Sequence, residues 1–210
     1  MRVYPKHFRW EGAQERRVAV AVPNLPRPGG FRRWIGLLVL GWVATAASMP
    51  AQTSREYDLK AVLLFNLTRF VEWPPESFAG ADTPLVIGIL GQDPYGKILD
   101  DVVRTESYGH HKIEVVRFRD LESVKDCQIL YIGADESRNL SRILARLDGQ
   151  PLLTVGDFEA FSQRGGMVGL NQNAEGKIRL RINLEAVRSS HLTVSGKLLR
   201  VAEVVNRGKE

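Results

Sequence analysis

Two kinds of hydrophobic pattern alternate along the chain between residues 85 and 155. Short apolar runs rich in branched aliphatic residues, bounded by glycine or proline, predict four buried strands at residues 85–90, 112–119, 128–132 and 152–155. Apolar positions spaced three or four apart predict helices near residues 97–104 and 137–147. This alternation is typical of an α/β fold with a predominantly parallel sheet flanked by helices on both faces.

The C-terminal part of the chain has a different pattern. Residues 167–170 and 177–183 flank a polar segment and predict an antiparallel hairpin. A short helix over residues 184–189 and a terminal helix over residues 196–205 complete the predicted elements. The expected fold class is therefore α/β with a C-terminal antiparallel hairpin.

A longer helix is predicted over residues 54–73, with Ser54 as its N-cap and a Pro-Pro pair directly after it. Its apolar residues occupy two sides of the helix. One side carries Tyr57, Ala61, Leu64, Phe65, Thr68 and Val71, and the other carries Leu59, Leu63, Leu67 and Phe70. A helix that is apolar on two sides is either enclosed by the core or offers one side to a partner.

The N-terminal region has the pattern of a secretory signal peptide. Two arginines at 32 and 33 precede an apolar run over residues 34–49, and small residues follow near its end. An uncleaved membrane anchor is the alternative, but the run is short and is interrupted by glycine, serine and threonine. We therefore expect a removed leader over residues 1–51, a single domain over residues 52–210, and localisation in the periplasm.

Charge follows the same division. The chain carries 29 Lys and Arg against 24 Asp and Glu, a net charge of +5. Residues 1–51 hold eight of the cations and two of the acids, so the predicted domain is close to neutral at −1. With no cationic field over the predicted domain, we expect no nucleic-acid partner. A composition that is 44% hydrophobic and 25% charged is that of an ordinary globular protein.

Several residues could carry chemistry, but each has a simpler interpretation. Cys127 is the only cysteine, and its place before a predicted strand favours a buried structural thiol. The loop at residues 91–96 has two glycines, but Asp93 would repel phosphate, so a tight turn is favoured. His110 and His111 point to opposite sides of an extended segment, which favours a solvated pair over a metal site.

Asp157 lies at the carboxyl end of a predicted strand, where open α/β sheets place functional groups. We interpret it as the N-cap of a short helix over residues 158–162, with catalysis as the alternative. Lys177, Arg179 and Arg181 alternate along one strand and are typical of a charged sheet edge. No paired nucleophile or acid–base set is recognisable, so we expect no enzyme activity, cofactor or metal.

Four segments of the predicted domain resemble the YfiR-like periplasmic family. They read KAVLLFNLTRFVEWP at residues 60–74, LLTVGDFEAF at 152–161, GGMVGL at 165–170 and KIRLRINLEAVRSSHLTVSGKLLRVA at 177–202. The resemblance covers about residues 55–205 in the expected order. Its characterised members are non-enzymatic repressors that bind the periplasmic sensory region of an inner-membrane diguanylate cyclase. They thereby lower cyclic di-GMP and restrain biofilm formation.

The resemblance also marks motif residues, most of which we interpret as fold-defining. They are Lys60, Asn66, Phe70, Trp73, Asp157, Gly165, Gly166, Asn183, Ser195 and Lys197. Some members link their structure to redox state through cysteine pairs, which a chain with Cys127 alone cannot form.

Pattern and resemblance together predict a regulatory binding protein that is not inserted in the membrane once mature. Phe65, Phe70 and Trp73 are expected to form a surface for a receptor or a second copy, or the core directly beneath it. The alternative is a small-ligand sensor with a pocket near Gly91, Gly133 and Asp157.

Overall fold

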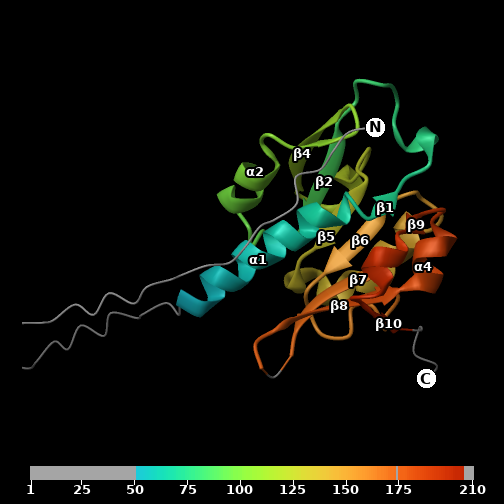
Figure 1. Cartoon of the computed structure of the whole chain (residues 1–210). Coiled ribbons are helices and arrows are strands. Elements are labelled where there is room, and N and C mark those ends of the chain that lie inside the picture. The colour runs from blue at the N-terminus through green and yellow to red at the C-terminus, as the bar shows by residue number, and fades with distance from the viewer. Residues whose placement is uncertain (1–50, 174, 206–210) are drawn as a thin grey trace, which may run out of the picture. The chain divides into compact units, whose positions relative to one another are not determined.

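A long N-terminal helix crosses one face of a twisted, mostly parallel sheet (Figure 1). The computed structural model describes residues 51–173 and 175–205. The predicted signal peptide lies outside this part, so its cleavage and the boundary at residue 51 remain predictions. Within the described residues, no helix combines the length and the apolar composition that crossing a bilayer would require.

The main sheet has eight strands in the order β10-β8-β7-β6-β5-β2-β4-β3. Their bounds are β2 Leu85–Leu90, β3 Ser107–Tyr108, β4 His111–Phe118, β5 Ile129–Ile132, β6 Leu153–Gly156, β7 Val168–Gln172, β8 Ile178–Asn183 and β10 Glu203–Val205. All neighbours are parallel except β3 with β4 and β7 with β8. The predicted α/β class and the C-terminal hairpin are both confirmed.

Five α-helices accompany the sheet in the described part of the chain. They are α1 Ala51–Leu67, α2 Lys97–Val103, α3 Leu140–Leu147, α4 Leu184–Ser189 and α5 Gly196–Leu199. Three 3-10 turns lie at Pro75–Ser77, Leu121–Ser123 and Ala134–Asn139. A separate small sheet pairs β1 Val71–Glu72 with β9 Thr193–Val194.

Alternating side chains of the buried strands divide the core into two layers, one on each face of the sheet. In β2, Leu85, Ile87 and Ile89 belong to the layer under α1 and α2. Leu90 belongs to the opposite layer, under α3, together with Leu130 and Cys127. Cys127 is 7% exposed, which confirms the expected buried thiol. Helices therefore cover both faces, as the strand pattern predicts.

The first helix is shorter than its apolar spacing predicts. It ends at Leu67, and the chain then turns and forms β1. The hydroxyl of Thr68 donates to the carbonyl of Phe65, which closes the last turn. Beyond it, the Trp73 indole donates to the Gln128 carbonyl at 3.0 Å. Residues 68–70 form hydrogen-bonded turns, and the pairing with β9 and this anchor hold residues 71–73 in an extended path. The predicted helical continuation to residue 73 is therefore wrong.

The C-terminus also differs from the prediction. Helix α5 ends at Leu199, and the chain continues into β10, which pairs in parallel with β8. Arg181 on β8 bonds Glu203 on β10 at 3.1 Å. The predicted helix to residue 205 is wrong after its first turn, because β-branched residues near the end fit an extended strand. Of the charged stripe, Arg181 therefore lies beside β10 and not at the sheet edge, while Lys177 and Arg179 lie outside the residues that pair with β10.

Candidate functional site

A buried ion pair joins the first helix to the carboxyl edge of the parallel strands. Lys60 lies on α1, and Asp157 follows β6 directly. The Lys60 Nζ is 2.8 Å from Asp157 Oδ2, and the two side chains are only 3% and 5% exposed. Glu56, one helical turn before Lys60, contacts the same ammonium at 2.5 Å. The structure thus brings together two of the motif residues, 97 positions apart in the chain.

Three tyrosines surround this ion pair. The Tyr131 hydroxyl donates to Asp157 Oδ1 at 2.7 Å, so both carboxylate oxygens have partners. The Tyr95 ring meets the Tyr131 ring edge to face, with centroids 4.9 Å apart. The Tyr57 ring packs in the same way on Tyr95, with the Lys60 ammonium 4.9 Å from its centroid. The Tyr95 hydroxyl is buried without a hydrogen-bond partner among the described residues.

Electrostatics keep this cluster in one protonation state at neutral pH. Burial acts to lower the pKa of Lys60, but hydrogen bonds to Asp157 and Glu56 raise it overall. Burial, with the charge of Asp157, raises the pKa of Tyr95. Burial and the neighbouring Tyr95 and Asp157 raise the pKa of Tyr131 in the same way. The lysine remains charged and the tyrosines remain protonated at neutral pH. These states favour a structural ion pair that holds α1 against the sheet over a proton-transfer site.

The expected role of Asp157 as a helix N-cap is therefore wrong. Residues 158–165 form turns, not a helix, in the structure. The Asp157 carboxylate bonds Lys60 and Tyr131, both distant in sequence, instead of the backbone that follows it. A buried carboxylate is stabilised more by a cation than by a local amide, so the long-range pair prevails.

The crevice between β2 and β5 is filled by the protein itself. A Cβ on Gly91 or Gly133 would lie about 2.6 Å or 2.5 Å from the Asp135 carboxylate. That carboxylate accepts the backbone N–H of Gln92 at 2.9 Å. Asp93 accepts the N–H groups of the following turn, as expected for a tight loop. An acidic side chain thus occupies the place where the alternative hypothesis expected a ligand.

A second candidate site is an apolar groove of about 330 Å³ beside α1. Elements α1, β8, α5 and β10 form its walls. The lining residues are Leu63, Asn66, Leu67, Phe70, Ile178, Arg179, Leu180, Leu198, Val201 and Glu203. Large apolar side chains are exposed on α1, on β10 and in the turn between α5 and β10: Leu59 at 52%, Val62 at 40%, Val201 at 75% and Val204 at 47%. The second apolar side of α1 therefore faces this groove.

The three aromatic residues predicted for a partner surface have different positions. Phe65 and Trp73 are 6% and 7% exposed and belong to the core. Phe70 is half-buried and lines the apolar groove, next to the motif residue Asn66. Of the three aromatics, only Phe70 lines the groove and is available to a partner, while the other two belong to the core.

The remaining motif residues lie in the C-terminal part of the domain, at the end of β8, in the turn before β7 and at the start of α5. Asn183 caps α4 by accepting the Ala186 N–H, and it also donates to the Ser162 carbonyl. Ser195 caps α5 by accepting the N–H of Lys197, whose side chain is exposed. Gly165 has a φ of 103°, a conformation that favours glycine. These contacts support a fold-defining role for the three residues Asn183, Ser195 and Gly165.

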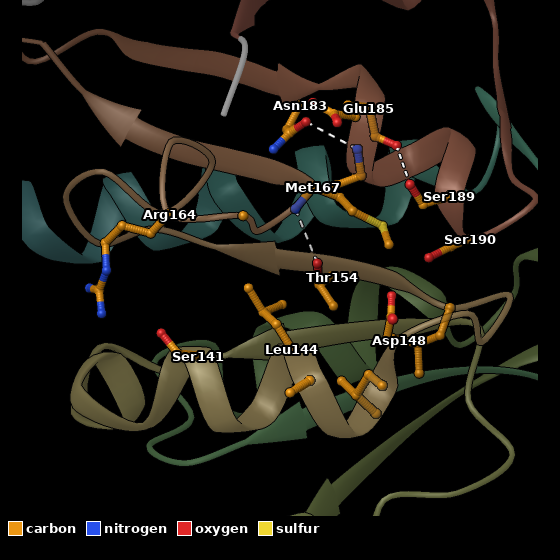
Figure 2. Close-up of a pocket in the computed structure, with 15 residues that line it drawn as sticks. Ser141, Leu144, Asp148, Thr154, Arg164, Met167, Asn183, Glu185, Ser189 and Ser190 are labelled. Atoms are coloured by element: carbon orange, nitrogen blue, oxygen red, sulfur yellow. Dashed lines mark hydrogen bonds between the residues drawn. The ribbon is translucent and has the colours of Figure 1, made fainter. Parts of the chain in front are cut away.

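A third candidate site, the polar pocket, lies between α3 and α4 (Figure 2). Its volume is about 290 Å³. Its lining residues come from α3, α4 and the strand ends between them: Ser141, Leu144, Ala145, Leu147, Asp148, Leu152, Thr154, Arg164, Gly165, Met167, Asn183, Glu185, Ala186, Ser189 and Ser190. Sequence reasoning missed this pocket, because no motif links residues from segments so far apart.

The sequence predicts that His110 and His111 are both solvated, but this is wrong for His111. His111 is half-buried, its ring stacks on Phe78 with centroids 4.1 Å apart, and its Nδ1 is 2.6 Å from the Thr83 carbonyl oxygen. His110 is exposed. Among the residues that the structure describes, no group of three or more His, Cys, Asp or Glu side chains is arranged to hold a metal ion.

A comparison with protein families bears on these sites. A family model described as YfiR/HmsC-like matches residues 57–203. The match begins at Tyr57, beside the buried ion pair, and ends at Glu203, the first residue of β10. It therefore includes Lys60 and Asp157 and the residues that line the apolar groove and the polar pocket.

Proposed function

This chain belongs to the YfiR/HmsC-like family, and on that premise we propose that it is a regulatory binding protein of the periplasm. It represses an inner-membrane diguanylate cyclase by binding the periplasmic sensory region of that enzyme, which lowers cyclic di-GMP and biofilm formation. The family supports this regulatory role. The predicted signal peptide supports the compartment.

The observation that carries the proposal is the apolar groove on the outer side of α1. Val201 and Leu59 are 75% and 52% exposed beside it, and Phe70 lies in its wall. Burying a large aliphatic or aromatic side chain is worth about 1.5–3 kcal/mol. A partner that covers these residues therefore gains binding energy without any chemical step.

The buried ion pair has a supporting role in this proposal. It fixes α1 against the strand ends at Lys60, about one turn before the groove-lining Leu63 and about two turns before Asn66. A helix held in this way presents its outer side in one position, which reduces the ordering cost of binding. Repression then follows if the receptor's inactive conformation binds the groove more tightly than its active one.

Substitutions in the groove test this function directly. Val201→Asp places a charge on an already exposed position, so the fold should persist while partner binding is lost. In cells that lack the native gene, the Val201→Asp protein should fail to lower cyclic di-GMP, and Phe70→Asp should fail as well. Both should also lose capture of the cyclase sensory region in a purified pull-down.

Ala81→Asp is the matched control, because Ala81 is exposed near the opposite edge of the sheet. It should repress as the native protein does. Full repression by both groove variants at native protein levels would refute the role of the groove. Unchanged cyclic di-GMP after deletion of the native gene would refute the proposed function itself.

A further inference from the structure

The polar pocket between α3 and α4 has opposite charges at its two ends. Figure 2 shows Arg164 at one end and Asp148 at the other, with Glu185 on the α4 side. The Arg164 guanidinium donates to the Ser137 carbonyl at 2.7 Å, which holds it beside the start of α3. Among the ion pairs between described residues, none includes Arg164, Asp148 or Glu185.

Helix α3 reinforces this polarity, because it runs along the pocket from one charged end to the other. Its N-terminus, with a partial positive charge, lies at the Arg164 end. Asp148 is its C-cap, where the helix dipole is negative. A carboxylate at that position is repelled by the helix, so a ligand cation there would remove an unfavourable interaction.

The middle of the pocket is part apolar and part polar. Leu144 and Met167 face it from α3 and from the segment before β7 (Figure 2). Thr154 and Ser190 also line it and are 1% and 4% exposed, so the floor contains buried hydroxyls. The Thr154 hydroxyl accepts the backbone N–H of Met167 at 3.1 Å. This surface suits a ligand that alternates small apolar groups with hydrogen-bonding groups.

Length and volume limit the size of that ligand. Ser141 and Asp148, both in the lining, are separated by seven residues of α3, which corresponds to about 10 Å along the helix axis. An extended peptide spans up to about 3.5 Å per residue, so three residues match this length. A volume of about 290 Å³ admits small side chains only.

From these observations we propose that the polar pocket binds a zwitterionic peptide of about three small residues. Its terminal ammonium lies against Asp148 and Glu185, and its terminal carboxylate lies against Arg164. This binding is separate from the apolar groove and does not depend on the proposed repression of a cyclase.

Calorimetric titration of the purified protein with trialanine tests the proposal. A ligand of this size is expected to bind with a dissociation constant on the order of 0.1–1 mM. N-acetylation or C-amidation of the peptide should each weaken binding by about three- to tenfold, because each removes one charged contact. Acetylation should have no effect on the Asp148→Asn/Glu185→Gln variant, and amidation none on Arg164→Gln.

Asp82→Asn and Arg142→Gln are the controls, since both residues are exposed and lie outside the pocket lining. They should retain both capping effects. The proposal is overturned if trialanine gives no heat at about 10 mM, or if the doubly capped peptide binds as tightly as the free one. The proposal is also overturned if acetylation and amidation of the peptide still weaken its binding to the pocket variants. The terminal charges of the peptide would then bind at another site.

Discussion

At the scale of single residues, the Lys60–Asp157 pair stands out because both of its charged side chains are almost fully buried. Removing two charges from water is costly, and the cost is offset only when every polar atom finds a partner. Here Tyr131 and Glu56 supply the remaining partners. Loss of one member would leave the other charged and buried, which is worse than the loss of both.

A double-mutant cycle measures this effect. Lys60→Met and Asp157→Asn should each lower the free energy of unfolding by about 3 kcal/mol. The double variant should be more stable than the sum of the two losses predicts, by about 1 kcal/mol or more. Lys97→Met is the control, because its pair with Asp101 is exposed and should contribute less than about 0.5 kcal/mol. If the two losses of unfolding free energy, measured by urea denaturation, are simply additive in the double variant, Lys60 and Asp157 do not stabilise the protein as a pair.

The sequence identified both members of this pair but not their contact. Lys60 and Asp157 are 97 residues apart, and nothing in their local patterns connects them. The sequence predicts a helix cap at Asp157, because a local amide is the nearest donor in the chain. The structure instead uses a donor supplied by the fold, and such competition cannot be judged from one segment.

At the scale of elements, Phe161 locks the turn between β6 and β7. It is fully buried, and its ring lies against Gly156 at the end of β6 and against Gly166 before β7. A Cβ on Gly156 would lie 2.5 Å from the ring, and one on Gly166 would overlap it. Gly156 and Gly166, the second glycine of GGMVGL, thus allow a large aromatic ring to fill the space between the ends of the two strands.

Gly166→Ala should therefore destabilise the domain by about 1–3 kcal/mol through overpacking. The smaller side chain of Phe161→Leu should recover part of this loss in the double variant, since it makes room for the new methyl group. Gly196→Ala provides the comparison: a Cβ there meets no atom within 4 Å, so its effect should be neutral or slightly stabilising. Equal thermal shifts for the two alanine variants would rule out the packing argument.

Strands and helices with a clear period were predictable at this scale. Helix α4 matches its predicted bounds, and the apolar runs became β2, β5 and β6 with small shifts at their ends. The errors lie at residues 68–73 and 200–205, where an apolar helical spacing continues past the helix. There, pairing with β9 and β8 decides the structure, and these strand contacts are not visible in the local pattern.

At the scale of the whole molecule, side chains of the protein occupy part of the carboxyl edge of the sheet, and the two proposed binding sites lie elsewhere. The Asp135 carboxylate lies beside Gly91 and Gly133, and the ion pair with its tyrosines lies at the end of β6. The apolar groove is instead formed by α1 together with β8, α5 and β10, and the polar pocket is formed by α3, α4 and the strand ends between them. The sequence places functional groups at this edge by the general rule for α/β sheets, but it cannot show the groove and the pocket, whose walls come from distant segments.

The buried acids of this core also determine how stability depends on pH. Burial raises the pKa of Cys127 from 9.0 to about 12, so the unfolded chain releases the thiol proton before the folded protein does. A raised pKa in the folded state leaves stability unchanged below pH 9 and lowers it as the pH rises through the interval to 12. The tyrosines Tyr95 and Tyr131 extend the same loss above pH 10.

Between pH 8 and pH 10, Cys127 is therefore the first of these groups to act. The free energy of unfolding should fall by about 1 kcal/mol over this range in the native protein, measured by urea denaturation under reducing conditions. Cys127→Ala should be less stable at pH 8 because it leaves a small cavity, yet its stability should change less with pH. The two curves should converge toward pH 10. If they stay parallel, the thiol is not shielded from water, and the packing of Cys127 in the layer under α3 must be looser than the structure shows.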